Sequence, residues 1–229
     1  MNTNMFSSGN REEAVAEYYK LQAAGYHHKY YRNDSEFDEC IKAESELLQN
    51  TFRGLDVLEI ACGTGFWTEF VAETANSVLA TDVNSSMIAE AGKRLSHLSN
   101  VSFSVADAYC LNNVSEGFTG AFAVLFWCHI PRQRTGDFLA ILHGKLLPGS
   151  PVVFICQLED SDVKTHKTDK YGNKLALRRK DGKDFTILKN TPKKNQLIAD
   201  LKHLADDIRY SVFPGSSYWC ISYKTRAGK

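Results

Sequence analysis

Three acidic residues stand near the ends of apolar runs that are typical of buried strands, and each could hold a polar ligand. Glu59 lies in "VLEI", Asp82 closes "VLATD", and Asp107 follows "FSV". A carboxylate can accept hydrogen bonds from both hydroxyls of a ribose, and it can also accept an N–H from an adenine amino group. Because ligands bind at the carboxyl ends of the strands in a doubly wound sheet, these residues predict a nucleoside site at that edge.

The stretch "ACGTGFWT" follows the first apolar run and contains two glycines, Gly63 and Gly65. Glycine permits backbone angles that a Cβ blocks, so the chain can turn at once from a strand into a helix and expose N–H groups to a ligand. The third glycine of a dinucleotide-binding G-x-G-x-x-G is replaced by Thr68, which weakens the dinucleotide interpretation. An acid after the second strand occurs in nicotinamide enzymes and in methyltransferases, whereas the further acid, Asp107, favours a cradle for one adenosine. The pattern therefore favours S-adenosylmethionine (SAM).

Short β-branched runs alternate with helical periodicity from Leu55 onward, which indicates βαβ units and a parallel sheet. Two helices, over Glu12–Ala24 and Phe37–Gln49, are expected before this alternation begins. The strands are expected over Asp56–Ile60, Ser77–Asp82, Val101–Val105, Ala121–Trp127 and Pro151–Gln157, and the helices between them over Phe66–Thr74, Ser85–Leu95 and Arg132–Leu147.

The rhythm changes after Gln157. Asp181-Gly182 stands between two alternating stretches and predicts a hairpin, and Thr191-Pro192 begins a helix over Lys193–Ala205. The segments Asp207–Phe213 and Ser217–Thr225 are joined by "PGS", which is too short for a parallel crossover, so they must pair antiparallel.

The predicted fold is α/β: a Rossmann-like, doubly wound, mostly parallel seven-stranded sheet with an antiparallel last strand, two N-terminal helices and an inserted hairpin after strand five. We expect one domain over residues 1–229, with residues 1–50 as an N-terminal helical cap and residues 158–190 as an inserted cap on the substrate side.

Composition excludes several other classes of function. Lys+Arg and Asp+Glu both number 27, so no net charge draws the protein to nucleic acid or to an anionic membrane. The six cysteines are scattered and show no metal-ligand spacing with the histidines, so neither a disulfide framework nor a metal is expected. The chain shows neither a signal-peptide pattern nor a membrane-spanning run, which predicts a cytoplasmic protein. The oligomeric state stays open.

Longer motifs connect these features to a known family. "VLEIACGTGFWT", "VLATDVNSSMI" and "FSVADAY" resemble the first three motifs of class I SAM-dependent methyltransferases, and the resemblance runs from about Tyr18 to Thr225. Shorter stretches, among them "SSMIAEAG", "CHIP", "LLPG" and "RKDGKDFTILK", resemble the small-molecule branch that includes the phosphonate O-methyltransferase of dehydrophos biosynthesis. The chain departs from the broad family at Cys62, where glycine or serine is commoner.

The resemblance implies a role for each matching residue. The two glycines would line the methionine end of SAM and Asp82 its ribose. Met87 with Val83 would enclose the adenine, while Asp107 and the Ala108 amide would contact its edge. Phe126 and Trp127 would face the sulfonium. The full set expected around the cofactor is Tyr18, Glu59, Ala61, Gly63, Gly65, Trp67, Asp82, Val83, Met87, Asp107, Ala108 and Phe126.

The acceptor side offers fewer signals. His129, in "FWCHIP", is the best candidate for a general base; the alternative is that it packs beside Pro131 or caps the next helix. Tyr18, Tyr19 and Tyr26 could form a lid or could simply pack on the sheet. The residues expected to contact the acceptor are Tyr26, Trp127, Arg178, Arg179 and Lys189, the last three as a clamp for an anionic group or, alternatively, as solvated charges.

The sequence thus predicts methyl transfer from SAM to an O or N atom of a small metabolite that could be anionic. "FWCHIP" differs from the Asn/Asp-Pro-Pro-aromatic motif of enzymes that methylate nucleobase amines, so a nucleic-acid substrate is not expected. Two alternatives stay open at this point. One is a SAM-binding partner subunit without activity. The other, a nicotinamide oxidoreductase, lacks the tyrosine and lysine four residues apart that it would need near strand five.

Overall fold

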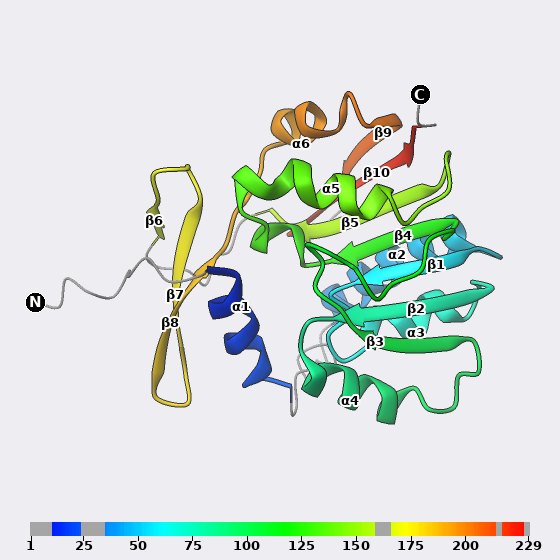
Figure 1. Cartoon of the computed structure of the whole chain (residues 1–229), viewed down its shortest axis with the longest axis horizontal. Helices are drawn as coiled ribbons and strands as arrows, with labels where there is room; N and C mark the ends of the chain where they lie inside the picture. The colour runs from blue at the N-terminus through cyan, green and yellow to red at the C-terminus, as the bar shows by residue number, and fades with distance from the viewer. Residues whose placement is uncertain (1–10, 24–34, 159–165, 214–216, 227–229) are drawn as a thin grey trace, which may run out of the picture.

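A seven-stranded sheet forms the centre of the molecule (Figure 1). The computed structural model describes residues 11–23, 35–158, 166–213 and 217–226. The strand order is β3-β2-β1-β4-β5-β10-β9, with β1 to β5 parallel. The bounds are β1 Asp56–Ile60, β2 Ser77–Asp82, β3 Val101–Val105, β4 Gly120–Val124, β5 Pro151–Gln157, β9 Ala205–Val212 and β10 Tyr218–Thr225.

Successive side chains of the central strands enter two separate hydrophobic clusters, one on each face of the sheet. In β1, Val57 packs on one face and Leu58 on the other, and both are fully buried. Helices α2 (Ser35–Phe52), α3 (Phe66–Ala72) and α4 (Ser85–Arg94) cover the first face, while α5 (Thr135–His143) and α6 (Lys194–Leu201) cover the second. Among the described residues, no helix has the length and apolar character needed to cross a lipid bilayer.

The last two strands pair antiparallel, as their short connection predicted. β10 lies between β5 and β9 and runs antiparallel to both. The predicted Rossmann-like, mostly parallel seven-stranded sheet is therefore confirmed. The order of strands reverses between β1 and β4, and in such sheets this point is where a ligand crevice opens.

The segment after β4 differs from the expected one. The predicted strand to Trp127 stops at Val124 because Leu125 takes a positive φ of 61°, a left-handed conformation that cannot continue a strand. A 3-10 helix, η2, follows over Trp127–His129. The helix predicted from Arg132 begins as a 3-10 turn, η3 (Arg132–Arg134), before α5. This irregular stretch faces the carboxyl edge of the sheet.

A second sheet stands apart from the first and was only partly predicted. Its strands are β6 (His166–Thr168), β7 (Lys174–Lys180) and β8 (Lys183–Leu188). Asp181 and Gly182 turn the β7–β8 hairpin with φ angles of 48° and 77°, as a type I′ turn requires. The third strand, β6, was not expected. Figure 1 shows α1 (Arg11–Lys20) between this sheet and the main one.

Helix α1 packs its apolar side chains on the second sheet. Val15 and Tyr18, together with Leu21 just after the helix, contact the small cluster that Ala176, Phe185 and Ile187 form. Its other side faces the carboxyl ends of the main-sheet strands. The helix and the second sheet therefore cover the edge at which the predicted site lies.

Candidate active site

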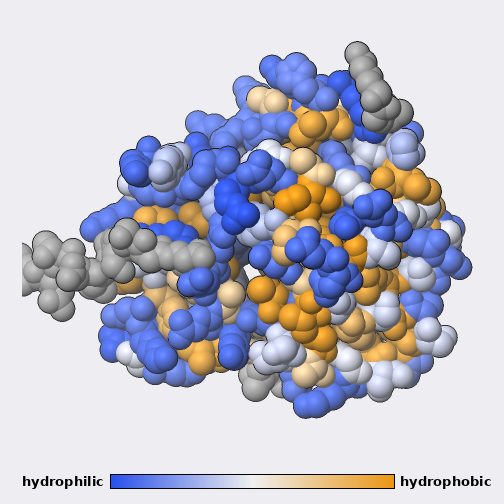
Figure 2. All heavy atoms as spheres, in the orientation of Figure 1, coloured by the Kyte–Doolittle hydropathy of each residue, from blue (hydrophilic) through white to orange (hydrophobic). Residues whose placement is uncertain are grey.

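A cavity of about 310 Å³ opens at the carboxyl ends of β1, β2 and β4, beneath α1. Its volume lies within the range of small-molecule sites. Figure 2 shows a hollow between the second sheet and the main body of the molecule, with hydrophobic residues along one rim. The predicted site residues that line the cavity are Glu59, Ala61, Gly63, Trp67, Asp82, Val83, Met87, Asp107, Ala108, Phe126 and His129.

The backbone at the edge of the cavity is held in unusual conformations. Ala61 follows β1 with a φ of 55°, and Leu125 follows the neighbouring β4 with a φ of 61°. Each non-glycine residue in this region costs about 1–3 kcal/mol, and such residues cluster at functional sites. Asp82 ties the turn together, because its carboxylate accepts the N–H of Gly63 at 3.0 Å and that of Asn84 at 2.8 Å.

Gly65 has a packing role, which corrects its expected place at the cofactor. It is absent from the cavity lining, and a Cβ on it would meet Leu95 Cδ1 at 2.9 Å and Ala91 Cβ at 3.3 Å. Its φ of 78° also lies in the left-handed region that favours glycine. This glycine is required so that α3 can begin close against α4.

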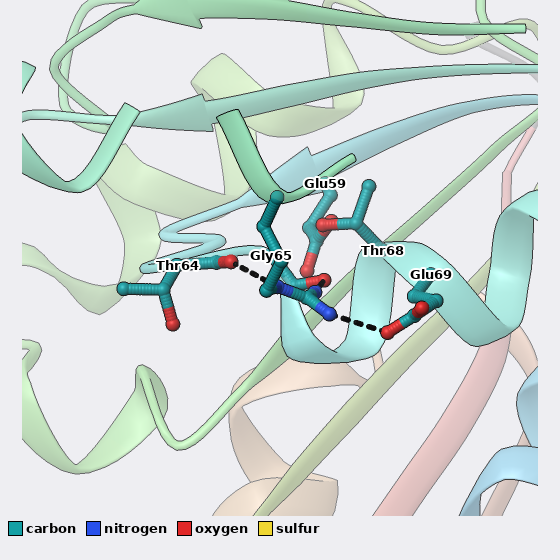
Figure 3. Close-up of polar contacts among 6 residues, drawn as sticks. Glu59, Thr64, Gly65, Thr68 and Glu69 are labelled. Atoms are coloured by element: carbon teal, nitrogen blue, oxygen red, sulfur yellow. Dashed lines mark hydrogen bonds and ion pairs between the residues drawn. The ribbon is translucent and has the colours of Figure 1, made fainter. Parts of the chain in front are cut away.

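Arg94 clamps the turn from α4. Its guanidinium donates to the carbonyl oxygens of Thr64, at 3.1 Å from Nε, and of Gly65, and it forms an ion pair with Glu69. Figure 3 shows the dashed contacts from the Thr64 carbonyl and from Glu69 meeting at one guanidinium group. No sequence signal marked this arginine, because two of its three partners are backbone carbonyls and the third, Glu69, lies 25 positions away.

Glu59 is buried in the cavity wall. Thr68 Oγ1 donates to its Oε2 at 2.5 Å, and Figure 3 shows the two side chains facing one another. Burial raises the pKa of Glu59 to about 8, although the Thr68 hydrogen bond opposes the shift. Burial also raises the pKa of Asp82, while N–H groups of the turn lower it. At neutral pH this shift favours a protonated Glu59.

Three polar atoms in the cavity wall lack a hydrogen-bond partner among the described residues. They are Thr64 Oγ1, Trp67 Nε1 and Tyr109 Oη, and each is buried. A buried polar group without a partner costs about 1–3 kcal/mol, so these atoms indicate a ligand that supplies the partners. The hydroxyl and the indole N–H lie where the amino-acid end of SAM is expected, so this part of the wall fits that group.

His129 lies in η2 with both ring nitrogens engaged. Nδ1 is 2.7 Å from the carbonyl oxygen of Leu188, and Nε2 is 3.0 Å from the hydroxyl of Tyr19. Because a carbonyl only accepts, Nδ1 carries the proton and the neutral ring presents Nε2 as an acceptor toward Tyr19. Both residues line the cavity. The ring nitrogens therefore do not cap the next helix, and a role for His129 as general base stays a prediction.

Two predicted aromatic contacts are corrected by the structure. Tyr18 points away from the cavity and packs against Phe185, with ring centroids 5.6 Å apart, because it occupies the face of α1 that covers the second sheet. Trp127 is buried in the core, 4.9 Å from the Phe154 ring and 6.3 Å from that of Trp219. The chain turns at Leu125, which moves Trp127 away from the strand end where it was expected.

The predicted basic clamp does not line the cavity. Arg179 is exposed and lies 3.7 Å from Asp184, and Arg178 lies half-buried in β7. Lys189 is buried beside Cys128, with Nζ 3.7 Å from Sγ. Among the described residues, the lining holds acids but neither lysine nor arginine. Tyr26 lies outside the described residues.

Sequence reasoning missed Asn84, Thr64 and Tyr109 in the lining and did not separate Tyr19 from Tyr18. The two adjacent tyrosines of "YY" carry no sequence signal that shows which ring faces the cavity.

Two polar contacts hold α1 in place. Asn84 donates to the Ala16 carbonyl at 3.0 Å, and Glu12 forms an ion pair with Arg134 at 2.6 Å. Both contacts hold α1 over the cavity.

Residues 57–149, which include this turn, match the family described as "Methyltransferase domain". Together with the sheet order and the cavity, this match shows that the chain contains a class I SAM-dependent methyltransferase domain. The class predicted from the motifs and its cofactor, SAM, are thereby confirmed.

Individual relatives agree with this assignment. The chain is similar to a phosphoethanolamine N-methyltransferase 1 of Caenorhabditis elegans, with 33% identity over 99 residues, which are 43% of this chain and 20% of the relative. The chain thus spans about a fifth of the length of that relative. A solved DhpI-SAH complex is 26% identical, covers 97% of this chain and 100% of its own, and has a TM-score of 0.74. A DhpI-SAM-HEP complex is also 26% identical, covers 95% and 99% respectively, and has a TM-score of 0.72.

Proposed function

We propose that the protein transfers the methyl group of SAM to an O or N atom of a small molecule bound beneath α1. The observation that carries this proposal is the Tyr19–His129 pair, which faces the same cavity as the glycine turn. A subunit that only binds SAM has no need of a histidine with a fixed tautomer beside an ionisable hydroxyl. The residues of the pair can hold and move a proton, as an acceptor with an O–H or N–H requires.

The wall supports a cofactor orientation with the adenosine toward β2 and β3. Asp82 and Asp107 follow these two strands, and Val83 and Met87 offer apolar surface between them. Thr64 and Trp67 offer donors for a carboxylate, and Glu59 offers an acceptor for an ammonium group. When bound there, SAM supplies an electrophilic methyl group on a sulfonium.

Asp82 has two roles in this proposal, so an alanine variant would not test the ribose contact alone. Its carboxylate already holds the N–H groups of Gly63 and Asn84, so an alanine would disturb the turn as well as the ribose contact. Asp82→Asn keeps one acceptor oxygen. We expect it to weaken SAM binding by about 1.5–3 kcal/mol, which is roughly 10- to 150-fold. Unchanged affinity in a folded variant would remove the ribose assignment.

Proton movement follows from the hydrogen bonds of His129. Its Nε2 accepts from the Tyr19 hydroxyl at 3.0 Å, and the Leu188 carbonyl stabilises the ring when it becomes positively charged. Tyr19 can therefore pass its proton to His129 and accept one from the reacting group. The edge-to-face contact of the two rings, with centroids 5.2 Å apart, keeps them aligned.

The class of acceptor is proposed from its surroundings. The curated relative is named for phosphoethanolamine, a small amine with an anionic group, which supports a small acceptor of that kind. The acids among the described lining residues favour an amine at the reacting end. We propose that residues 158–190, which include the second sheet, cap this end of the site.

The test compares neighbouring tyrosines in a methylation assay against a panel of small amines and alcohols, with phosphoethanolamine included. Tyr19→Phe and His129→Asn should each lower kcat by about 10²–10⁴-fold and leave SAM affinity unchanged. The double variant should lose no more than either single one, because the two act as a unit. Tyr18→Phe is the matched control and should retain full activity. Equal losses in Tyr18→Phe and Tyr19→Phe would overturn the proposal.

A further inference from the structure

Two buried asparagines fasten the second sheet to the segment that carries His129. Asn190 follows β8 and is 4% exposed, and Asn173 precedes β7 and is 1% exposed. Both lie outside the cavity lining, and neither was singled out by the sequence. Their side chains nevertheless make three polar contacts with the segment that carries His129.

Asn190 holds the backbone on both sides of His129. Its N–H donates to the carbonyl of Cys128 at 2.8 Å, and its Nδ2 donates to the carbonyl of Ile130 at 2.9 Å. The N–H of Lys174 donates to its Oδ1 at 2.9 Å, and because that group can only donate, the orientation of the amide is fixed.

Asn173 supports Asn190 from behind. Its Oδ1 accepts from Asn190 Nδ2 at 3.1 Å and from the N–H of Arg132 at 2.9 Å. Its Nδ2 donates to Gln133 Oε1 at 3.1 Å and to Asp169 Oδ2 at 3.0 Å. Buried polar networks of this kind are rigid when every member is satisfied.

We propose that Asn190, supported by Asn173, is a positioning residue that fixes the Leu188 carbonyl against Nδ1 of His129. This contact keeps the proton on Nδ1 and leaves Nε2 as the acceptor that faces Tyr19. Leu188 is two residues before Asn190, so the three contacts at Cys128, His129 and Ile130 join the two segments in one register. The inference rests on the proposed function for its effect on the reaction, but the ring tautomer can be measured independently.

The primary test is an NMR measurement of the His129 ring in the full chain labelled with nitrogen-15. The His129→Asn spectrum assigns the two ring signals by their loss. At a pH where the ring is neutral, the wild type should show a protonated Nδ1 and an unprotonated Nε2. Asn190→Ala keeps the backbone N–H contact to Cys128 but loses the side-chain contacts to Ile130 and Lys174, so the Leu188 carbonyl is held less firmly and signals of both tautomers should appear.

The second test separates positioning from stability. Asn190→Ala should lower kcat by about 10- to 100-fold and leave the SAM dissociation constant within about twofold of wild type, because the cofactor wall is not touched. The matched control is Asn100→Ala. Asn100 also holds two backbone carbonyls, those of Ala72 and Ala75, but it lies far from His129 along the sheet. It should change neither the tautomer nor kcat.

A wild-type ring with its proton on Nε2 would overturn the proposal whatever the variants do. The same holds if Asn190→Ala keeps the Nδ1 tautomer and matches Asn100→Ala in kcat. Should Asn190→Ala fail to fold, Asn173→Ser carries the test with the same expected direction. If the tautomer changes as expected but no acceptor is methylated by the wild type, the positioning role stands and the proposed function fails.

Discussion

Binding of SAM should release a proton from Glu59, because burial keeps this residue protonated at neutral pH and it must ionise to pair with an ammonium group. Its pKa is about 8, raised by burial. At pH 7 about nine-tenths of the molecules then carry this proton, so binding should release about 0.9 proton per site. Over the same range the affinity should rise with pH, by roughly 50-fold between pH 6 and pH 8, and should level off above the pKa.

Titration calorimetry at pH 7 in several buffers with different ionisation enthalpies measures the released protons directly. Glu59→Gln cannot ionise and should abolish the release. Thr68→Val removes the hydrogen bond that lowers the pKa of Glu59, so the release at pH 8 should increase. The reasoning is refuted if wild type releases no proton at pH 7, or if Glu59→Gln releases as many as the wild type.

Three further predictions concern the turn and the core. Gly65→Val should lower the free energy of unfolding by about 1–3 kcal/mol in denaturant titrations, because it forces a β-branched residue to a φ of 78°; unchanged stability would contradict the packing role. Arg94→Ala should weaken SAM binding by about tenfold in calorimetry, whereas Lys93→Ala, which removes an exposed ion pair, should not; equal effects would exclude the clamp. Burial raises the pKa of Glu44 to about 8, so the folded state keeps a proton that the unfolded state releases, and stability should fall as pH rises from about 4.5 to 8. Glu44→Gln should flatten this slope by up to about 1.4 kcal/mol per pH unit in urea unfolding, and an unchanged slope would show that Glu44 does not titrate there.

The parallel sheet and much of the cavity wall could be predicted because their signals are local. Strand ends in "VLEI" and "VLATD" combine apolar periodicity with an acid, and the turn between strand and helix needs glycine at Gly65 for steric reasons. The pattern did not distinguish a glycine that faces a ligand from one that faces a neighbouring helix. Both require the absence of a Cβ, so only the packing of α3 against α4 shows the difference.

The acceptor side was harder to predict because its residues meet through long-range contacts. Tyr19 and His129 are 110 positions apart, and the partner of the other ring nitrogen, Leu188, contributes only its carbonyl. A backbone carbonyl has no side-chain signature. Trp127 was misplaced for a different reason. Its apolar surroundings resemble a strand, but β4 ends at Val124 and the next residue, Leu125, has a positive φ.

The central claim, methyl transfer at the Tyr19–His129 pair, is tested most directly by following S-adenosylhomocysteine formation with methyl-labelled SAM and the acceptor panel. The wild type should form it together with a labelled acceptor in equal amounts, and His129→Asn should bind SAM normally but form at least about 100-fold less per unit time. If the wild type binds SAM but forms no S-adenosylhomocysteine with any acceptor, or if His129→Asn turns over as fast as the wild type, the claim is contradicted.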